Sequence, residues 1–246
     1  MSARSPATFV LVHGGWVGGW FWGRVAPLLR KSGHEVYTPT LTGLGERSHL
    51  ATPEVGLGTH AQDLEAVLYY EDLHDVVLVG HSYGGMVITA LAERAPERLA
   101  HLVYFDAFVP LDGENMTDLM GPDMTSAFQD MVETEGAGSR LPLPFPLEAY
   151  GFLSPEDLAW MNPRMSDQPW TTAVEPVAVR NRAAAAIPRS FVECTRLATG
   201  LMAQSAQRAR SAGWRVYPLD LPHAAPVSAP AAVADLLESI AKEGSQ

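Results

Sequence analysis

Apolar and β-branched residues gather in short continuous runs that recur along the chain. Such runs are typical of strands buried on both faces of a parallel sheet. They cover positions 8–12, 35–38, 75–79, 99–105, 189–195 and 214–219. Between them, apolar residues recur every third or fourth position at 59–70, 84–94, 202–212 and 229–242, as in helices with one buried face. The alternation predicts right-handed βαβ units and an α/β fold with a doubly wound, mostly parallel sheet of about six strands.

The alternation stops between residues 110 and 182, where Met, Pro and Trp are frequent and no strand pattern is visible. The run at 141–146 alternates with proline and cannot be a helix interior, whereas Ser154-Pro155-Glu156-Asp157 is a helix-start signal. Long insertions in compact domains are usually functional. We expect a mobile, mostly helical cap at about 110–182, inserted into a single domain that spans 1–246.

Composition narrows the classes of function. The 246 residues include 47% hydrophobic and 18% charged residues, which suits one globular domain. A net charge of -11 disfavours binding to nucleic acid or to anionic membranes. The expected partner is therefore a small, mostly apolar substrate, and the oligomeric state is left open, a homodimer included. The apolar run near the N-terminus is too brief for a signal sequence or a membrane span, so the default location is cytoplasmic.

One motif carries chemistry. The predicted strand at 75–79 runs directly into Gly80-His81-Ser82-Tyr83-Gly84-Gly85 and then into a predicted helix. A serine on such a strand-to-helix turn is a nucleophile elbow, in which small residues two positions away let the backbone close tightly. Ser82 is therefore the candidate nucleophile, and the bland alternative is an ordinary βα turn.

Two backbone N–H groups are candidate donors to an oxyanion. The Tyr83 N–H lies at the start of the helix after the nucleophile, where the helix dipole is positive. The second donor should come from the loop after the first strand, His13-Gly14-Gly15, where glycines let the backbone approach a substrate. Gly15 N–H is the choice, with Gly14 and His81 expected to line the substrate pocket.

A histidine beyond the last strand should be the general base, and His223 occupies that place. The carboxylate that orients such a base usually follows the strand after the cap, but the loop at 195–200 contains no Asp or Glu. Asp106 ends the strand next in sequence after the nucleophile strand, so it is the favoured substitute. Asp220, Glu193, a cap residue or no acid at all remain alternatives.

Four segments together resemble bacterial esterases of the α/β-hydrolase superfamily that are related to plant hydroxynitrile lyases and methylesterases, including pyrethroid-hydrolase-like carboxylesterases. They are residues 8–16, 37–47, 80–85 and 103–110. The resemblance implies Ser82 as nucleophile, Gly15 and Tyr83 as oxyanion donors and His223 as base. The family's acid would fall near Leu197, and its usual Gly-His-Asp around the base reads Pro222-His223-Ala224 here.

The leading interpretation is a serine hydrolase that cleaves a carboxylic ester of a small, largely apolar or aromatic substrate through an acyl-enzyme. The alternative is a non-hydrolytic enzyme on the same scaffold, such as a cyclase, a lyase or a carbon-carbon bond-forming catalyst of secondary metabolism. The lyase branch of the resembled family has a threonine where Gly14 stands and a lysine where Ala224 stands. A non-catalytic binder of apolar ligands is the third reading.

Aromatic and Met residues in the cap predict an apolar pocket over Ser82. Trp160 and Trp170 are the candidate substrate-binding residues, and the same pocket is expected to include Phe145, Phe152, Met161 and Met165. No metal or organic cofactor is expected, because the histidines and the single Cys194 lack zinc-like spacing and no phosphate-binding glycine loop is present. Cys194 lies in an apolar run and is interpreted as a structural thiol.

Overall fold

A six-stranded, fully parallel sheet forms the centre of the computed structural model, which describes residues 6–150, 153–196 and 200–243. The strand order is β2-β1-β3-β4-β7-β8. The bounds are β1 Thr8–Val12, β2 Glu35–Tyr37, β3 Val76–His81, β4 Leu99–Phe105, β7 Arg189–Cys194 and β8 Arg215–Leu219. The α/β fold class predicted from the sequence is confirmed, and each predicted strand lies within two residues of an observed one.

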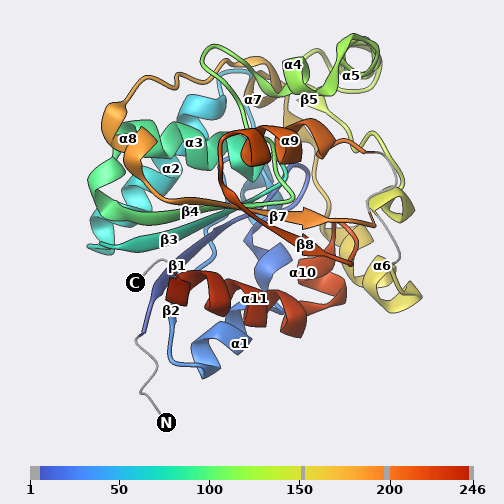
Figure 1. Ribbon diagram of the computed structural model, residues 1–246. Coiled ribbons are helices and arrows are strands. Elements are labelled where there is room, and N and C mark those ends of the chain that lie inside the picture. The colour runs from blue at the N-terminus through green and yellow to red at the C-terminus, as the bar shows by residue number, and fades with distance from the viewer. Residues whose placement is uncertain (1–5, 151–152, 197–199, 244–246) are drawn as a thin grey trace.

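Helices cover both faces of the sheet (Figure 1). Helices α1 and α11 lie on one face, and α2, α3, α8 and α9 lie on the other. Their bounds are α1 Ala26–Lys31, α2 Leu57–Tyr70, α3 Gly84–Arg94, α8 Arg182–Ala186, α9 Ala203–Ser211 and α11 Pro230–Glu243, with the short α10 at Ala225–Ser228 before the last helix. The doubly wound arrangement follows from right-handed crossovers between parallel strands.

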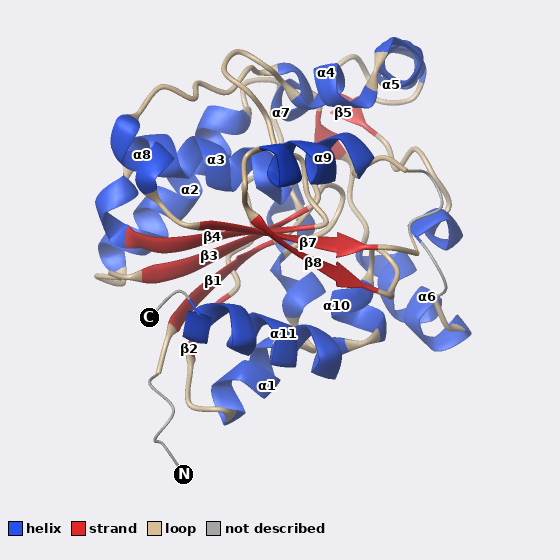
Figure 2. Cartoon of the chain, in the orientation of Figure 1, coloured by secondary structure: helices blue, strands red, loops and turns tan. Residues whose placement is uncertain are grey.

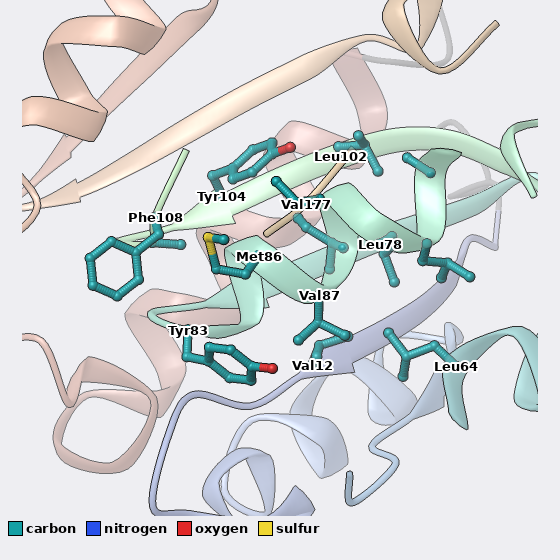
Figure 3. Packing of buried hydrophobic residues seen from close by; sticks show 14 of the residues in the cluster. Val12, Leu64, Leu78, Tyr83, Met86, Val87, Leu102, Tyr104, Phe108 and Val177 are labelled. Atoms are coloured by element: carbon teal, nitrogen blue, oxygen red, sulfur yellow. The ribbon is translucent and has the colours of Figure 1, made fainter. Parts of the chain in front are cut away.

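Strand β1 shows why its apolar run is continuous. Val10 and Val12 belong to the hydrophobic core beneath α2 and α3, whereas Phe9 and Leu11 belong to the core beneath α1 and α11. Successive side chains of a strand point to opposite faces, so a strand covered on both sides needs apolar residues at every position. On the α3 side, Met86 and Val87 of the helix pack in the same cluster as these sheet residues (Figure 3).

From α4 to α7, the segment between β4 and β7 lies over the carboxyl ends of the strands, and its regular structure is mainly helical (Figure 2). It contains α4 Met116–Met120, α5 Pro122–Thr134, α6 Pro155–Met161 and α7 Thr171–Val174, together with α8. It also holds a ribbon that the sequence did not predict, in which β5 Arg140–Leu141 pairs antiparallel with β6 Gln168–Pro169. Two-residue strands are too short to leave a period in the sequence.

Helix α6 begins where the sequence predicted a start. The Ser154 Oγ accepts a hydrogen bond from the Asp157 N–H at 3.0 Å, and the Asp157 carboxylate accepts one from the Ser154 N–H at 3.3 Å. This reciprocal pair is a capping box. Asp157 also pairs with Arg24 at 2.5 Å, and Arg24 donates to the Val227 carbonyl at 2.8 Å. One arginine therefore ties the cap to the segment just after His223.

In the part of the chain that the structure describes, no helix is long and apolar enough to cross a membrane.

Gly85 allows α3 to lie against the loop that follows β4. A Cβ at Gly85 would lie 2.2 Å from the Phe108 carbonyl oxygen, which is backbone and cannot move away cheaply. We therefore expect Gly85→Ala to lower the free energy of unfolding by about 1–3 kcal/mol, the usual cost of overpacking. Urea unfolding followed by circular dichroism measures the change.

Gly58→Ala is the matched control, since both glycines are the second residue of their helix. A Cβ at Gly58 would meet only the end of the Glu175 side chain, at 3.1 Å, which can shift. Helix propensity then favours alanine, so the control should be neutral or stabilising. Equal losses for the two variants would contradict the close-approach argument.

Candidate active site

Ser82 sits on the sharp turn between β3 and α3, with φ of 54°, a left-handed conformation that non-glycine residues rarely adopt. Glycines make room for this turn. A Cβ at Gly80 would lie 2.5 Å from the Gly84 carbonyl oxygen, and one at Gly84 would lie 2.8 Å from the His13 carbonyl oxygen. The strain is held by close backbone packing, and it projects the Ser82 side chain from the carboxyl edge of the sheet.

Asp106 directly follows β4 and is also left-handed, with φ of 44°. Phe105 pairs with His81 across the two strands, so Asp106 and Ser82 are the next residues on neighbouring strands. The Asp106 Oδ2 lies 2.6 Å from the His223 Nδ1, and both side chains are buried. The Asp106 Oδ1 accepts a hydrogen bond from the Cys194 N–H at 3.2 Å. One carboxylate oxygen of Asp106 thus contacts the histidine, and the other accepts a hydrogen bond from the main chain of β7.

The alternative acids lie elsewhere. Asp220 is exposed and ion-paired with Arg196 at 2.7 Å. Glu193 is ion-paired with Arg210 at the surface. Leu197, near which the resembled family's acid would fall, lies outside the described residues. Asp106 is therefore the candidate carboxylate that the structure places in contact with His223.

Gly15 lies in the loop after β1, and Tyr83 directly follows Ser82 at the start of α3. Gly14 and Gly15 line a small chamber together with Ser82 and His223. In the described part of the chain, neither the Gly15 N–H nor the Tyr83 N–H donates to a protein acceptor. The Tyr83 hydroxyl is anchored away from the chamber by a 3.0 Å hydrogen bond to His60 Nδ1. Neither of the two N–H groups expected to act as oxyanion donors is therefore engaged within the described chain.

His81 contacts His223 through both its ring and a hydrogen bond. Its Nε2 donates to the His223 carbonyl oxygen at 3.0 Å, and the two rings lie 4.3 Å apart between centroids. Its Nδ1 is buried without a hydrogen-bond partner among the described residues. Burial, together with the neighbouring His223, keeps the pKa of His81 well below its ordinary value. A neutral His81 lines the chamber, as expected from the sequence.

The chamber is closed. Its volume of about 20 Å³ leaves room for about one water molecule. Its walls come from the loops that follow β1, β3 and β8, from η1, the short 3₁₀ helix Gly19–Trp22, and from the cap. They are Gly14, Gly15, Trp16, Val17, Phe21, His81, Ser82, Leu147, Met161, Met165, His223 and Ala224. An ester substrate can enter only if the cap side chains move.

The cap tryptophans were expected in this chamber and are not in its walls. Trp160 packs edge-on against Trp20. The guanidinium groups of Arg24 and Arg164 lie 4.8 and 4.9 Å from the centroid of the Trp160 ring. Trp170 packs against core residues beneath the cap. Both rings are used to fasten the cap, so their expected role as substrate-binding residues is corrected.

Of the other apolar residues expected to line the chamber, some do and some do not. Met161 and Met165 do line the chamber. Phe145 packs against Phe128 within the cap, with ring centroids 6.1 Å apart, and Phe152 lies outside the described residues. Val17 and Phe21 also line the chamber but were not predicted from the sequence. They follow the loop after β1, at positions that look like those of ordinary core residues.

Met165 also borders a second space, an open polar groove of about 570 Å³. The groove is lined by Gly43, Ser48, His49, Ala51, Ser139, Arg140, Met165, Ser166 and Asp167. Leu147 and Met161 are buried in the cap, whereas Met165 is half-buried. Met165 is therefore the side chain that separates the closed chamber from the open groove.

Cys194 is buried, and burial and the Asp106 carboxylate both raise the pKa of its thiol. The thiol is consequently a poor nucleophile, and its backbone N–H is the part that serves the site. Among the described residues, no group of three or more His, Cys, Asp or Glu side chains is arranged to hold a metal ion.

Comparisons with known proteins agree with this geometry. The alpha/beta hydrolase family matches residues 9–236. A carbendazim hydrolyzing esterase of Nocardioides sp. (strain SG-4G) is 38% identical over 192 residues, which cover 76% of this chain and 79% of that protein. Polyneuridine aldehyde esterase of Rauvolfia serpentina is 32% identical over 117 residues, or 47% of this chain. That match spans 44% of the plant protein, less than half its length.

A solved structure resembles the whole chain. An extracellular alpha/beta-hydrolase from a Paenibacillus species, described as sharing structural and functional homology with tobacco salicylic acid binding protein 2, superposes with a TM-score of 0.84 at 28% identity. The superposition covers 95% of this chain and 98% of the other. The resemblance drawn from the sequence motifs is thereby confirmed.

Three buried histidines around the site make the fold sensitive to acid. Burial lowers the pKa of His13 to about 3 and that of His60 to about 4, and it lowers that of His81 well below the ordinary value. Below about pH 6.5 the unfolded chain takes up protons at these residues that the native state does not. Stability should therefore fall as the pH drops from 6.5, by up to about 1.4 kcal/mol per pH unit for each histidine. Urea unfolding between pH 7.5 and 5 measures the slope.

His60→Gln should reduce the slope of the free energy of unfolding against pH by the contribution of one histidine, because one titrating group is removed. Tyr83→Phe is the matched control, since it deletes the same hydrogen bond but leaves the histidine in place. The control should unfold more easily at every pH and keep the wild-type slope. Identical slopes for wild type and His60→Gln would rule out His60 as a contributor.

Proposed function

The chain belongs to the alpha/beta hydrolase family, and on that premise we propose that it is a serine esterase in which Ser82, His223 and Asp106 form the catalytic triad. The observation that carries the proposal is the buried 2.6 Å contact between Asp106 and His223, one residue beyond the strand pair that presents Ser82. Its relatives named as esterases support hydrolysis of an ester.

The first chemical step is attack on the ester carbonyl by the Ser82 Oγ, as His223 Nε2 takes the hydroxyl proton. Asp106 accepts the His223 Nδ1–H, so the imidazole lone pair is on Nε2, the nitrogen that serves as base. The same carboxylate stabilises the imidazolium that forms. Burial strengthens this effect because little water is present to screen the pair.

Negative charge then develops on the carbonyl oxygen. The N–H groups of Gly15 and Tyr83 are placed to donate to that oxygen, and the start of α3 adds its positive dipole end. Collapse of the tetrahedral species expels the alcohol, which takes the proton from His223, and leaves an acyl group on Ser82. A water molecule activated by the same histidine then releases the acid and restores the serine.

The walls of the chamber favour hydrolysis over the lyase alternative. Ala224 takes the place of the lysine of the resembled lyases, and none of the chamber's described lining residues is Lys or Arg. A side chain at Gly14 would also clash, because its Cβ would lie 2.9 Å from the Ser82 Cβ and 3.0 Å from the His81 Nδ1. With no cation to stabilise a departing anion such as cyanide, ester hydrolysis fits this site better.

The substrate is proposed to be a small ester with an apolar portion that occupies the chamber. Trp16, Phe21, Leu147 and Met161 surround Ser82 with apolar surface. Because Met165 separates the chamber from the polar groove, movement of this flexible side chain gives a direct route from solvent to Ser82.

Asp106→Asn tests the acid. The Asn oxygen can accept from the Cys194 N–H, which turns the amide NH₂ toward His223 Nδ1. His223 must then carry its proton on Nε2, the wrong tautomer for a base. We expect kcat on a p-nitrophenyl ester to fall by about 10³- to 10⁴-fold, with little change in thermal stability.

Asp220→Asn, at the exposed Arg196 pair, is the control and should keep wild-type kcat. An Asp106→Asn enzyme within about threefold of wild type would remove Asp106 from the mechanism. The nucleophile is checked separately, since a fluorophosphonate should label Ser82 in wild type and in Asp220→Asn but not in Ser82→Ala.

Met165→Ala tests the wall between groove and chamber. Removing this side chain should raise kcat/KM for long acyl esters relative to acetate by roughly tenfold, because a few methylene groups change transition-state binding by that order. Steady-state kinetics on a series of p-nitrophenyl esters gives the ratio. Met124→Ala makes the same deletion at a cap residue that is not among the chamber's lining residues, and it should leave the ratio unchanged. If both variants gave the same ratio, Met165 would not control the route from the groove to the chamber.

A further inference from the structure

His13 is fully buried directly before the two glycines of the candidate oxyanion loop, yet the mechanism above gives it no task. Its ring makes two hydrogen bonds to the backbone. The Leu41 N–H donates to Nε2 at 3.0 Å, and Nδ1 lies 2.8 Å from the carbonyl oxygen of Gly14, the next residue.

These two partners fix the proton on the ring. The Leu41 N–H can only donate, so Nε2 must accept and carries no proton. The Gly14 carbonyl can only accept, so Nδ1 carries the proton and donates it. Burial lowers the pKa of His13 to about 3, which keeps this neutral tautomer in place at ordinary pH.

The hydrogen bond to Gly14 sets the orientation of one peptide group. The described chain contains no cis peptide, so the Gly14 carbonyl and the Gly15 N–H point in opposite directions. With the carbonyl turned to the His13 ring, the N–H is turned away from that ring. Both glycines line the chamber that contains Ser82.

A Gly-Gly peptide has little intrinsic preference for this orientation, because glycine reaches most backbone conformations at low cost. If the peptide turned over, the carbonyl of Gly14 would replace the N–H of Gly15, and a negative dipole would face the developing oxyanion. The following residue is held from the other side. Trp16 has φ of 61°, its carbonyl accepts from Ser166 N–H at 2.9 Å, and its indole N–H donates to Leu141 carbonyl at 3.0 Å.

We propose that His13 is a positioning residue, which locks the Gly14–Gly15 peptide so that the Gly15 N–H donates to the oxyanion formed at Ser82. The inference rests on the esterase function proposed above. The tautomer of His13 is required for this role, because only Nδ1–H can hold the Gly14 carbonyl. The effect belongs to the transition state, where the oxygen becomes charged, so loss of the lock should lower kcat and leave KM nearly unchanged.

Two substitutions separate the two hydrogen bonds. His13→Asn places an amide NH₂ near the position of Nδ1 and keeps a donor for Gly14, but it has no group for Leu41. His13→Gln extends an amide to the position of Nε2 and keeps an acceptor for Leu41, but it loses the donor to Gly14. Each variant loses one buried hydrogen bond, so a purely structural role predicts similar losses for both.

The experiment compares the two variants with wild type on a p-nitrophenyl ester, alongside thermal unfolding. His13→Gln should lose about 10²- to 10³-fold in kcat, the usual effect of removing one oxyanion donor, with KM within about threefold. His13→Asn should stay within about tenfold of wild type. A trifluoromethyl ketone, which forms a tetrahedral adduct with Ser82, should bind the Gln variant more weakly by the same factor as the fall in kcat/KM.

Equal kcat values for the two variants, or a loss confined to KM, would overturn the positioning role while the esterase proposal stood. Absence of ester turnover and of fluorophosphonate labelling in the wild-type protein would overturn the esterase proposal, and this one with it.

Discussion

The register between β3 and β4 is the constraint on which the site depends. His81 lies opposite Phe105, so the chain leaves both strands at the same level and the next residues are Ser82 and Asp106. Both adopt left-handed φ values, 54° and 44°, which turn their side chains out of the sheet instead of continuing the strand alternation. A slip of one residue in this pairing would reverse the faces of the two ends.

The acid proposed for this site follows β4, one strand away from its place in the resembled family, and β7 still contacts it. In the resembled family a carboxylate follows the strand after the cap, which is β7 here. Strand β7 supplies a backbone group instead, because the Cys194 N–H holds the Asp106 carboxylate from the side opposite His223. Asp106 N–H in turn donates to the Val192 carbonyl at 2.7 Å, so the acid is pinned to β7 through main chain and side chain alike. In the proposed triad, β4 supplies the acid and β7 anchors it.

The sequence predicted what backbone geometry dictates and missed what side-chain partners decide. Strand runs, the elbow around Ser82 and the nearness of Asp106 to His223 follow from periodicity and strand adjacency, which are local or topological. Trp160 and Trp170 were misplaced because an aromatic ring in a cap can face either a pocket or another ring, and composition does not distinguish the two. Arg24 and Trp20, which hold Trp160, lie more than a hundred positions away in the sequence. The role of His13 was missed for a related reason, since its partner Leu41 belongs to another loop.

The chamber also explains why backbone orientation matters so much here. The described residues around Ser82 offer no cation, and the three buried histidines near it stay neutral because burial lowers their pKa values. Stabilisation of a developing oxyanion must then come from N–H dipoles, which act over short distances and only when correctly aimed. A closed, nearly dry chamber strengthens those dipoles, since little solvent competes with them. With so little solvent present, a peptide carbonyl that pointed at the oxyanion would also be more destabilising. A site that relies on N–H dipoles in place of charged groups therefore needs buried hydrogen bonds that fix the orientation of those dipoles.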